Sequence, residues 1–461
     1  MRPSSPILPL LFAVALVSGA SAVAADPAST ALPGLDDVRA TAIVGAVDPT
    51  QLQATIRKLV SFGTRHTMSD TVSDTRGIGA ARRWAASRFA AISKDCGGCL
   101  EIVTPSQSFT GPRLPTATEV TDVLAIQRGT GDPTRVVLIA GHIDSRNSDG
   151  MDFTNDASGA NDDASGVAAA IESARVLSKH RFRATVVYAA LSGEEQGLYG
   201  GKVLADYAKA QGWKVQADLN NDIVGNTLGE DGVHDSSTVR VFSEGTKAIE
   251  TQAQANVRRY RGGEIDSPSR NIARYMATIA ERDMAGFKVR MVYRTDRFGR
   301  GGDQVPMLEA GFPAVRVTES HEHYDRQHQN VRVENGRAYG DVIEFVDFPY
   351  LAQVTRLNAL TLAAMAAAPA PPTGVVAEGA VKHDTTITWQ PVPGAIGYRV
   401  WWRDTTAPQW QFHRDVRVAA GGATRAVLQN IVIDDWAFGV SSVDEAGNES
   451  PIVYPGDAGS F

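Results

Sequence analysis

The chain has 461 residues, of which 52 are acidic and 45 are basic, so its formal net charge is −7, and 43% of its residues are hydrophobic. This length predicts two or three domains with sizeable cores, and the composition excludes a chain that is disordered throughout. Basic residues are not clustered in the sequence, which argues against a protein that binds nucleic acid or anionic membranes. Small soluble partners are favoured.

Residues 1–25 are typical of a secretory signal peptide. Arg2 precedes an apolar stretch at residues 7–17, and small residues follow up to a cleavage site after Ala24 or Ala25. The apolar stretch is shorter than the roughly 20 residues that cross a bilayer, so a membrane anchor is disfavoured. We therefore expect a periplasmic or secreted protein that has no membrane contact after cleavage.

The chain contains two cysteines, Cys96 and Cys99, which follow a predicted helix at residues 79–92. In an oxidising compartment this pair favours a loop disulfide. A thioredoxin-like redox site is disfavoured, because that motif lies between a strand and a helix, in that order.

Between about residues 40 and 365, apolar runs alternate with helical patterns, as in a mainly parallel sheet flanked by helices. Four runs predict strands, namely residues 136–140, 184–190, 215–219 and 313–318. In open α/β sheets the functional site lies beyond the carboxyl ends of the strands. The polar groups that follow the four runs are therefore expected to meet at one edge of the sheet.

These polar groups are carboxylates and imidazoles, which are ligands for zinc, cobalt or manganese. Two such ions about 3.5 to 4 Å apart can drive hydrolysis when one carboxylate bridges them and another accepts a proton. That chemistry requires two histidines, three ligating carboxylates and one free carboxylate. The candidates are His142, Asp144, Asp162, Asp163, Glu194, Glu195, Asp222, His321, His323 and His328.

The motifs around these residues resemble those of the M28 family of zinc aminopeptidases, in order and approximate spacing, over roughly residues 50–360. The resemblance implies the zinc exopeptidase fold, peptide substrates and two Zn²⁺ ions that Co²⁺ or Mn²⁺ could replace. The matching motifs are Gly141-His142-Ile-Asp144-Ser, Gly159-Ala-Asn-Asp162-Asp163-Ala-Ser-Gly, Gly193-Glu194-Glu195-Gln-Gly and Asn221-Asp222.

The resemblance assigns the metal ligands. His142 and Asp222 would hold one ion, Glu195 and a late histidine would hold the other, and Asp162 would bridge both. Of the candidates for the late histidine, His328 fits the family best because a polar turn follows it. The alternatives are His323 and His321.

The resemblance also implies roles around the ions. Glu194 would be the general base that takes a proton from the attacking water and later protonates the leaving amine. Asp144 would orient His142, and Asp163 would help to hold a strained peptide bond that aims the bridging carboxylate.

The loop at residues 294–304 departs from the family pattern, because it has Asp303-Gln304 where much of the family has Asp-His. It also carries three arginines, Arg294, Arg297 and Arg300. An arginine can clamp a substrate carboxylate, as a carboxypeptidase requires, or can tie the loop to nearby acids. The specificity of the site is therefore left open.

Beyond a Pro-rich linker at residues 369–373 the pattern changes. Residues 374–461 hold five of the seven tryptophans, in short β-branched and aromatic segments between Pro and Gly turns, which predicts a β-sandwich. This tail resembles a fibronectin type III domain, with Trp389 as the expected core residue and a strand that includes Gly397 and Tyr398. Its aromatic residues could contact carbohydrate or protein, although core packing explains most of them.

The predicted fold class is α/β, with a mixed, mainly parallel sheet flanked by helices and an all-β C-terminal sandwich. We expect a dizinc exopeptidase, in the first place an aminopeptidase. The alternatives are a carboxypeptidase, another amidohydrolase such as a glutaminyl-cyclase-like enzyme with one metal, or a catalytically inactive binding module. The expected domains are a signal peptide (1–25), an N-terminal arm or propeptide (26–50), the metallopeptidase domain (51–368), the linker (369–373) and the sandwich (374–461).

Overall fold

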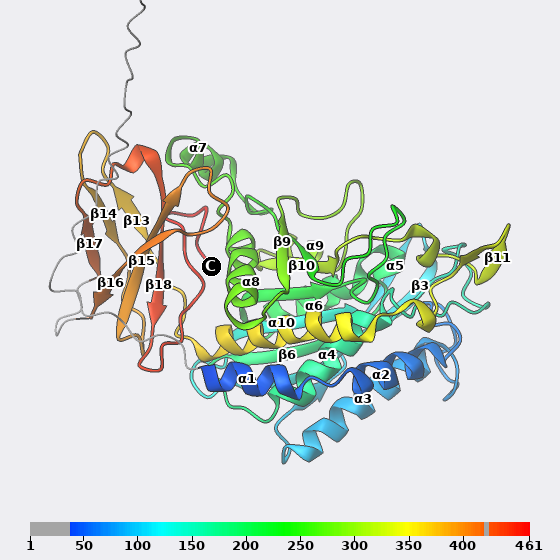
Figure 1. The fold of residues 1–461 in the computed structure, drawn as a ribbon. Helices are drawn as coiled ribbons and strands as arrows, with labels where there is room; N and C mark the ends of the chain where they lie inside the picture. Colours follow the sequence, from blue (N-terminus) through cyan, green and yellow to red (C-terminus); the bar gives the residue numbers. More distant parts are fainter. Residues whose placement is uncertain (1–36, 419–423) are drawn as a thin grey trace, which may run out of the picture.

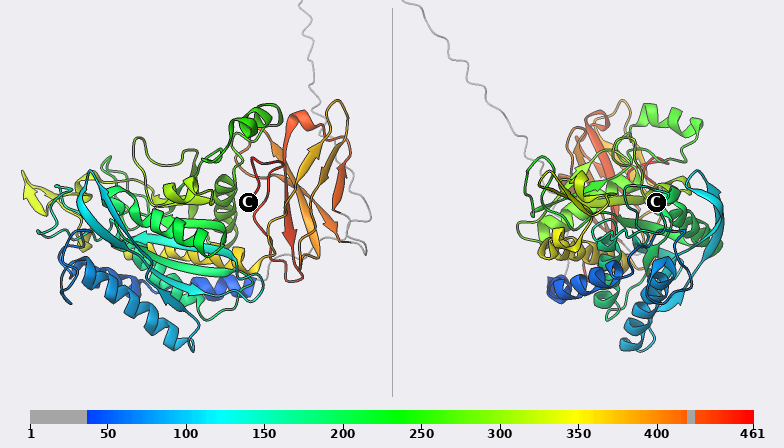
Figure 2. Two further views of the ribbon diagram at one scale, coloured as in Figure 1. Left: turned by 180° about the vertical axis from the view of Figure 1, so that it is seen from behind. Right: turned by 90° about the vertical axis from the view of Figure 1, so that its right-hand side faces the viewer.

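The structure is a computed structural model that describes residues 37–418 and 424–461. The predicted signal peptide and part of the predicted N-terminal arm lie outside the described residues. The described chain forms a large α/β part and a smaller β part that lie side by side (Figures 1 and 2). No helix in these two ranges is long and apolar enough to cross a membrane.

An eight-stranded mixed sheet organises the α/β part, in the order β1-β4-β6-β5-β7-β10-β8-β9. The central strands β6, β5, β7 and β10 are parallel, whereas β4 is antiparallel to β6 and β8 is antiparallel to β10. The predicted α/β class is thus confirmed. The strands are β1 (Glu101–Val103), β4 (Val123–Gln127), β5 (Arg135–His142), β6 (Thr185–Leu191), β7 (Lys214–Asn221), β8 (Thr238–Phe242), β9 (Lys288–Val292) and β10 (Ala314–Glu319).

Helices cover both faces of this sheet, so its central strands are apolar on both sides. On β5, Val137 and Ile139 pack in one core, and Val136 and Leu138 pack in the other. The first face is covered by α1 (Asp37–Ala46), α2 (Pro49–Val60), α3 (Gly77–Asp95), α4 (Ala164–Leu177), α8 (Pro268–Asp283) and α10 (Phe348–Ala367) (Figure 1). The second face is covered by α6 (Tyr199–Ala210) and α9 (Gln304–Glu309).

Smaller elements surround the sheet. The predicted helix at residues 79–92 lies within α3, and Cys96 and Cys99 form a disulfide in the turn that follows it. The remaining elements are the short helices α5 (Glu194–Gly197) and α7 (Gln252–Arg261), the hairpin of β2 (Ser106–Gly111) and β3 (Leu114–Thr121), and the hairpin of β11 (Arg332–Glu334) and β12 (Arg337–Tyr339).

The C-terminal part is a sandwich of two three-stranded antiparallel sheets, as the sequence predicts. Trp389, Tyr398 and Val400 are buried in its core. The fibronectin type III resemblance of this part stays a prediction. One sheet contains β13 (Val376–Glu378), β14 (Thr385–Thr388) and β17 (Arg425–Leu428), and the other contains β16 (Phe412–Arg417), β15 (Gly397–Asp404) and β18 (Trp436–Val443).

A buried ion cluster joins the two parts. Asp266, in the loop before α8, accepts hydrogen bonds from Arg274 of α8 at 2.8 Å and from Arg403 of β15 at 2.7 and 2.9 Å. All three side chains are at most 4% exposed. One carboxylate thus pairs with a guanidinium group from each part of the molecule.

Candidate metal centre

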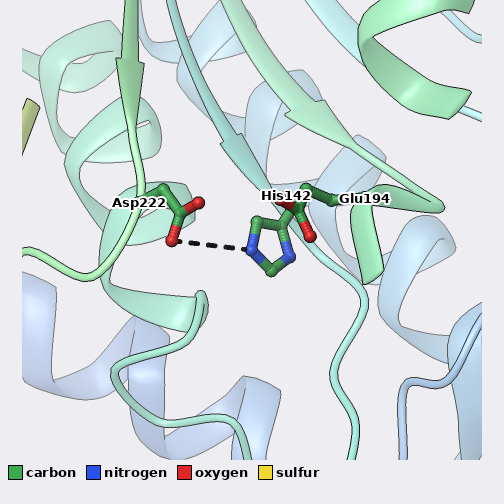
Figure 3. A group of neighbouring side chains, drawn as sticks. All are labelled: His142, Glu194 and Asp222. Atoms are coloured by element: carbon green, nitrogen blue, oxygen red, sulfur yellow. Dashed lines mark ion pairs between the residues drawn. The ribbon is translucent and has the colours of Figure 1, made fainter. Parts of the chain in front are cut away.

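The central strands bring the predicted ligands together at one edge of the sheet. His142 is the last residue of β5, Glu194 and Glu195 open α5 just beyond β6, and Asp222 directly follows β7. Because β6, β5 and β7 are adjacent and parallel, their carboxyl ends converge. Figure 3 shows the side chains of His142, Glu194 and Asp222 grouped at these strand ends.

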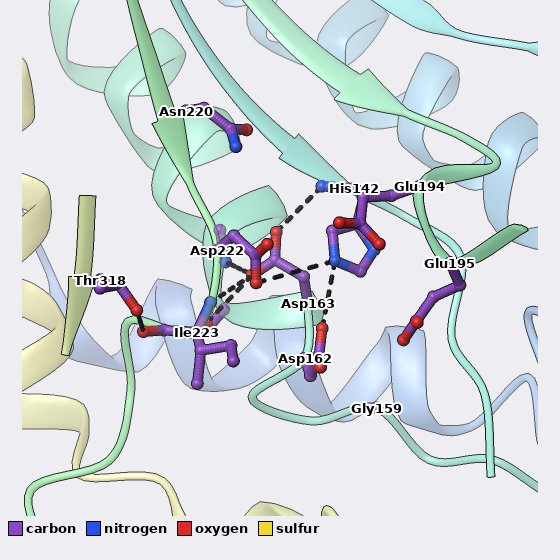
Figure 4. Close-up of polar contacts among 12 residues, drawn as sticks. His142, Gly159, Asp162, Asp163, Glu194, Glu195, Asn220, Asp222, Ile223 and Thr318 are labelled. Atoms are coloured by element: carbon purple, nitrogen blue, oxygen red, sulfur yellow. Dashed lines mark hydrogen bonds and ion pairs between the residues drawn. The ribbon is translucent and has the colours of Figure 1, made fainter. Parts of the chain in front are cut away.

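Asp162, in the loop before α4, lies between two histidines. Its Oδ1 atom is 3.1 Å from Nε2 of His142, and its Oδ2 atom is 2.9 Å from Nε2 of His328. The same nitrogen of His328 is 2.9 Å from Oε1 of Glu195. Nε2 of His142 is 3.9 Å from Oδ1 of Asp222 (Figure 4). A carboxylate that faces one imidazole with each oxygen has the geometry of a bridging ligand.

Two sets of three side chains bring their ligand atoms within 4.8 Å of one another. One set is His142, Glu194 and Asp222, and the other is Asp162, Glu195 and His328. Both contain imidazole nitrogens and carboxylate oxygens, which suit zinc.

Two buried atoms support the fit to metal ions. Nε2 of His142 and Oε1 of Glu195 make no hydrogen bond of regular geometry within the described part of the chain, although they lie 3.1 Å from Asp162 and 2.9 Å from His328. Burying such atoms without a hydrogen bond is costly, and a coordinated ion would satisfy both. The residues therefore fit two divalent cations, with Asp162 between them.

The charges of the cluster also favour a cation. Burial raises the pKa of Glu194 well above its ordinary value. Burial opposes protonation of His142, but Asp144 and Asp162 raise its pKa well above the usual range. For His328, Glu195 and Asp162 outweigh burial and raise the pKa to about 10.

Asp144 supports both the histidine and the glutamates. Its carboxylate accepts hydrogen bonds from the backbone N–H groups of Glu194, at 3.3 Å, and Glu195, at 3.1 Å. Nδ1 of His142 is 3.6 Å from this carboxylate and 3.1 Å from the backbone carbonyl oxygen of Asp144. Asp144 therefore positions the start of α5, and its carbonyl group is the nearer partner of the imidazole.

Asp163 connects three segments around the bridging residue. Its carboxylate accepts hydrogen bonds from the backbone N–H groups of His142, at 2.9 Å, Gly166, at 2.9 Å, and Ile223, at 3.3 Å. The peptide bond between Asp162 and Asp163 is cis. Asp163 thus fixes the ends of β5 and β7 relative to α4, and with them two predicted ligands.

The three histidines after β10 have different surroundings. His328 joins the second set of ligands, whereas Nδ1 of His321 is 2.9 Å from the carboxylate of Asp231. His323 is in neither ligand set within the described ranges. The side chain that ends β10, Glu319, is buried and accepts a hydrogen bond from Asn161 at 2.8 Å. The candidate ligand that follows β10 therefore comes from the loop after the strand, and not from the last residue of the strand.

Two supporting residues were not singled out from the sequence. Arg316 of β10 is fully buried and forms an ion pair with Asp222. Asp341 accepts hydrogen bonds from the backbone N–H groups of Asn161, at 2.8 Å, and Asp162, at 2.7 Å. An arginine inside an apolar strand was a signal for the first, whereas the sequence contains no comparable signal for the second.

All residues of the two ligand sets except His142 line a cavity of about 380 Å³. In the loop that departs from the family pattern, Asp303 is buried and accepts a hydrogen bond from the backbone N–H of Gly201 at 2.9 Å. Gln304 donates to Asp296 at 2.6 Å. Both residues thus hold the loop in place rather than line the cavity.

Sequence comparisons identify the family of this fold and site. The sequence model of "Peptidase family M28" matches residues 122–346. A "Probable zinc metalloprotease" of Leptosphaeria maculans is 44% identical over 420 residues, which are 90% of this chain and 96% of the relative. The chain belongs to peptidase family M28. A second relative with that name, from Pyrenophora tritici-repentis, is 42% identical over 91% of this chain and 87% of its own length. This M28 member is accordingly a zinc metallopeptidase.

Solved structures agree with the fold. The LapA aminopeptidase of Legionella pneumophila has a TM-score of 0.51 at 16% identity, over 75% of this chain and 79% of LapA. LapB of the same organism has a TM-score of 0.50 at 15% identity, over 72% of this chain and 77% of LapB. At these identities the likeness concerns the fold of the M28 domain alone.

Proposed function

We propose that this M28 peptidase is a dizinc exopeptidase, and in the first place an aminopeptidase that releases N-terminal residues from peptides. The observation that carries the proposal is Asp162, which faces His142 with one oxygen and His328 with the other. His142 and Asp222 would hold one ion, Glu195 and His328 the other, and Asp162 would bridge them. Co²⁺ or Mn²⁺ could replace zinc.

When bound, the two cations would polarise the scissile carbonyl group and lower the pKa of a water molecule. The protein supplies the proton transfer. Glu194 lines the cavity beside the proposed ligands, so its carboxylate can take the proton of the attacking water and pass it to the leaving amine nitrogen. Burial keeps the proton affinity of Glu194 high, which suits a group that must hold the proton between these steps.

Whether the enzyme is an aminopeptidase or a carboxypeptidase depends on which end of the peptide it recognises. The fold that this chain shares with the LapA aminopeptidase supports an aminopeptidase. A carboxypeptidase, or another amidohydrolase, is the second candidate because arginines line the cavity. Two complete ligand sets favour two ions over the single ion of a glutaminyl-cyclase-like enzyme.

Three substrates test the proposal. Zinc-loaded protein is incubated with an aminoacyl amide that has a free amine, with its N-acetylated form, and with an N-blocked dipeptide that has a free carboxylate. Cleavage of the first alone supports an aminopeptidase, and cleavage of the third alone overturns that direction in favour of a carboxypeptidase. Absence of any cleavage, despite two bound ions, would indicate an inactive binding module.

We also propose that the protein acts in the periplasm or after secretion. The signal-like residues 1–25 and the disulfide between Cys96 and Cys99 support this location. Fractionation of cells that produce the full chain, with detection of the mature N-terminus, tests it.

A further inference from the structure

Four arginines line the cavity of the metal centre, and they come from three separate segments. Arg113 is at the turn of the β2–β3 hairpin, Arg146 is in the loop after β5, and Arg297 and Arg300 are in the loop before α9. Segments that are distant in the sequence thus place the same kind of cation at one cavity.

Two of these arginines form ion pairs with acids outside the cavity lining. Glu322 lies 3.6 Å from Nη1 of Arg297 and 3.0 Å from Nη1 of Arg300. These arginines, Arg240 and Arg316 help to lower the pKa of Glu322 to about 2, against the effect of its burial. Arg297 and Arg300 therefore tie their loop to the end of the sheet, which is the structural role that the sequence left open.

The other two arginines contact only backbone carbonyl groups. Arg113 donates from Nη1 to the carbonyl oxygen of Glu195 at 2.7 Å. Arg146 donates from Nε to the carbonyl oxygen of Asn147 at 3.2 Å and from Nη2 to that of Ser148 at 3.5 Å. Within the described residues, neither forms an ion pair. Both leave guanidinium N–H groups for a further acceptor.

The acids of the cavity are those of the proposed metal centre. The described acidic residues in its lining are the four of the metal centre, Asp162, Glu194, Glu195 and Asp222. Two divalent ions would neutralise these four carboxylates. The lining then contains no acid, among the residues that the structure describes, for a substrate ammonium group, but it retains two unpaired guanidinium groups.

From this arrangement we infer that Arg113 and Arg146 bind a substrate carboxylate close to the scissile bond. This inference rests on the proposed function and narrows it to peptides that carry a carboxylate there. Arginine pairs with carboxylates through two parallel hydrogen bonds, which suits recognition of such a group. The carboxylate has two sources, the free C-terminus of a short peptide or an acidic side chain next to the cleaved bond.

Matched peptides separate these sources. The zinc-loaded protein is assayed with Ala-Ala amide, which has no carboxylate, with Ala-Ala and N-acetyl-Ala-Ala, which have a terminal carboxylate, and with Glu-Ala amide, which has a side-chain carboxylate. We expect kcat/KM for at least one carboxylate source to exceed that for Ala-Ala amide by about tenfold or more, as a charge-assisted pair allows. Equal values for all four peptides would overturn the inference.

Variants of the two arginines test whether they cause the preference for carboxylate peptides. In Arg113→Gln/Arg146→Gln, the ratio of kcat/KM for the carboxylate peptide to kcat/KM for Ala-Ala amide should fall to within about threefold of unity. Arg113→Lys/Arg146→Lys keeps the charges and should retain part of the preference. Arg128→Gln, which removes an exposed ion pair with Glu101, is the control. If the double Gln variant slows all peptides equally, the arginines do not recognise the carboxylate.

A binding measurement distinguishes this inference from the proposed function. Calorimetry with the zinc-loaded Glu194→Gln variant compares the dissociation constants of the preferred carboxylate peptide and of Ala-Ala amide. Tighter binding of the carboxylate peptide, lost on Arg113→Gln/Arg146→Gln, supports the inference even if the wild-type protein cleaves no peptide. Equal binding overturns it even if the protein is an active exopeptidase.

Discussion

The carboxylate of Glu194 is the group whose loss should stop the reaction but leave the centre intact. Glu194→Gln preserves size and removes the base, so we expect kcat to fall by about 10³-fold, within the range for loss of a general base. The zinc content should stay at that of the wild type, because the proposed ligands are unchanged. Metal analysis and peptide kinetics on the same sample measure both quantities.

Glu309→Gln is the matched control, because Glu309 is exposed at the end of α9. It should alter neither quantity. Loss of zinc from Glu194→Gln would instead indicate that Glu194 is a metal ligand. Its position beside His142 and Asp222 is compatible with that role.

Substitution of Asp162, unlike that of Glu194, should remove metal. Asp162→Ala removes both oxygens that face His142 and His328, so we expect the protein to lose at least one of two zinc ions and all measurable turnover. Metal analysis after dialysis provides the measurement. Asp156→Ala, which removes only an exposed partner of Arg76, should keep both ions. Retention of two ions in Asp162→Ala would exclude a bridge.

Single residues were predictable from the sequence where a motif fixed them to a strand end. His142, Glu194, Glu195 and Asp222 lie at or just beyond the ends of buried strands, so the sheet dictates their positions. His328 was less certain because it lies well beyond the end of β10, and a long loop can place several side chains at the same point. Arg113 and Arg146 were not predicted, since nothing in the local sequence marks which arginine of a hairpin or loop lines the cavity.

At the scale of elements, the turn after α3 offers a test of the disulfide. Cys96 and Cys99 are only three positions apart in the sequence, so their disulfide closes a very short loop. Closing a loop of this length restricts the unfolded chain little and stabilises the folded protein by only about 2 kcal/mol. Neither cysteine lines the cavity. Cys96→Ser/Cys99→Ser should therefore lower the free energy of unfolding in urea by about that amount and leave kcat/KM unchanged. A loss of activity in the folded variant would give the pair a functional role.

Strands were predictable in the centre of the sheet and not at its edge. Continuous apolar runs mark β5, β6, β7 and β10 because helices bury both of their faces. In contrast, β9 is partly exposed along its length and has no such run. Beyond β7, Ile223 has a φ of 61°, so the chain leaves the strand direction directly after Asp222.

On the scale of the whole molecule, Asp266 connects the two parts. Asp266→Ala would leave Arg274 and Arg403 buried and unpaired, and breaking a buried ion pair costs about 3 to 5 kcal/mol. We expect a loss of this order in the free energy of unfolding, measured by urea denaturation. Glu101→Ala removes an exposed partner of Arg128 and should cost at most about 1 kcal/mol. An equal effect of both substitutions would mean that the two parts are not coupled through Asp266.

The division into an α/β part and a sandwich was predictable, because the composition changes after residue 368. Their contact was not. Arg274 lies on the amphipathic helix α8 and Arg403 lies near the end of strand β15, and nothing in the local pattern of either element predicts a shared carboxylate. Contacts between domains depend on how two finished surfaces match, which single-sequence periodicity does not encode.

The order of the central strands has a consequence for how the protein is made. β6 and β7 follow β5 in the chain but lie on opposite sides of it. A growing chain can therefore assemble the first set of ligands only after Asp222 has been synthesised and both flanking strands have paired with β5. His328 completes the second set still later. Zinc should thus occupy both sites only in chains that extend beyond His328 and, by mass action, favour the folded ones.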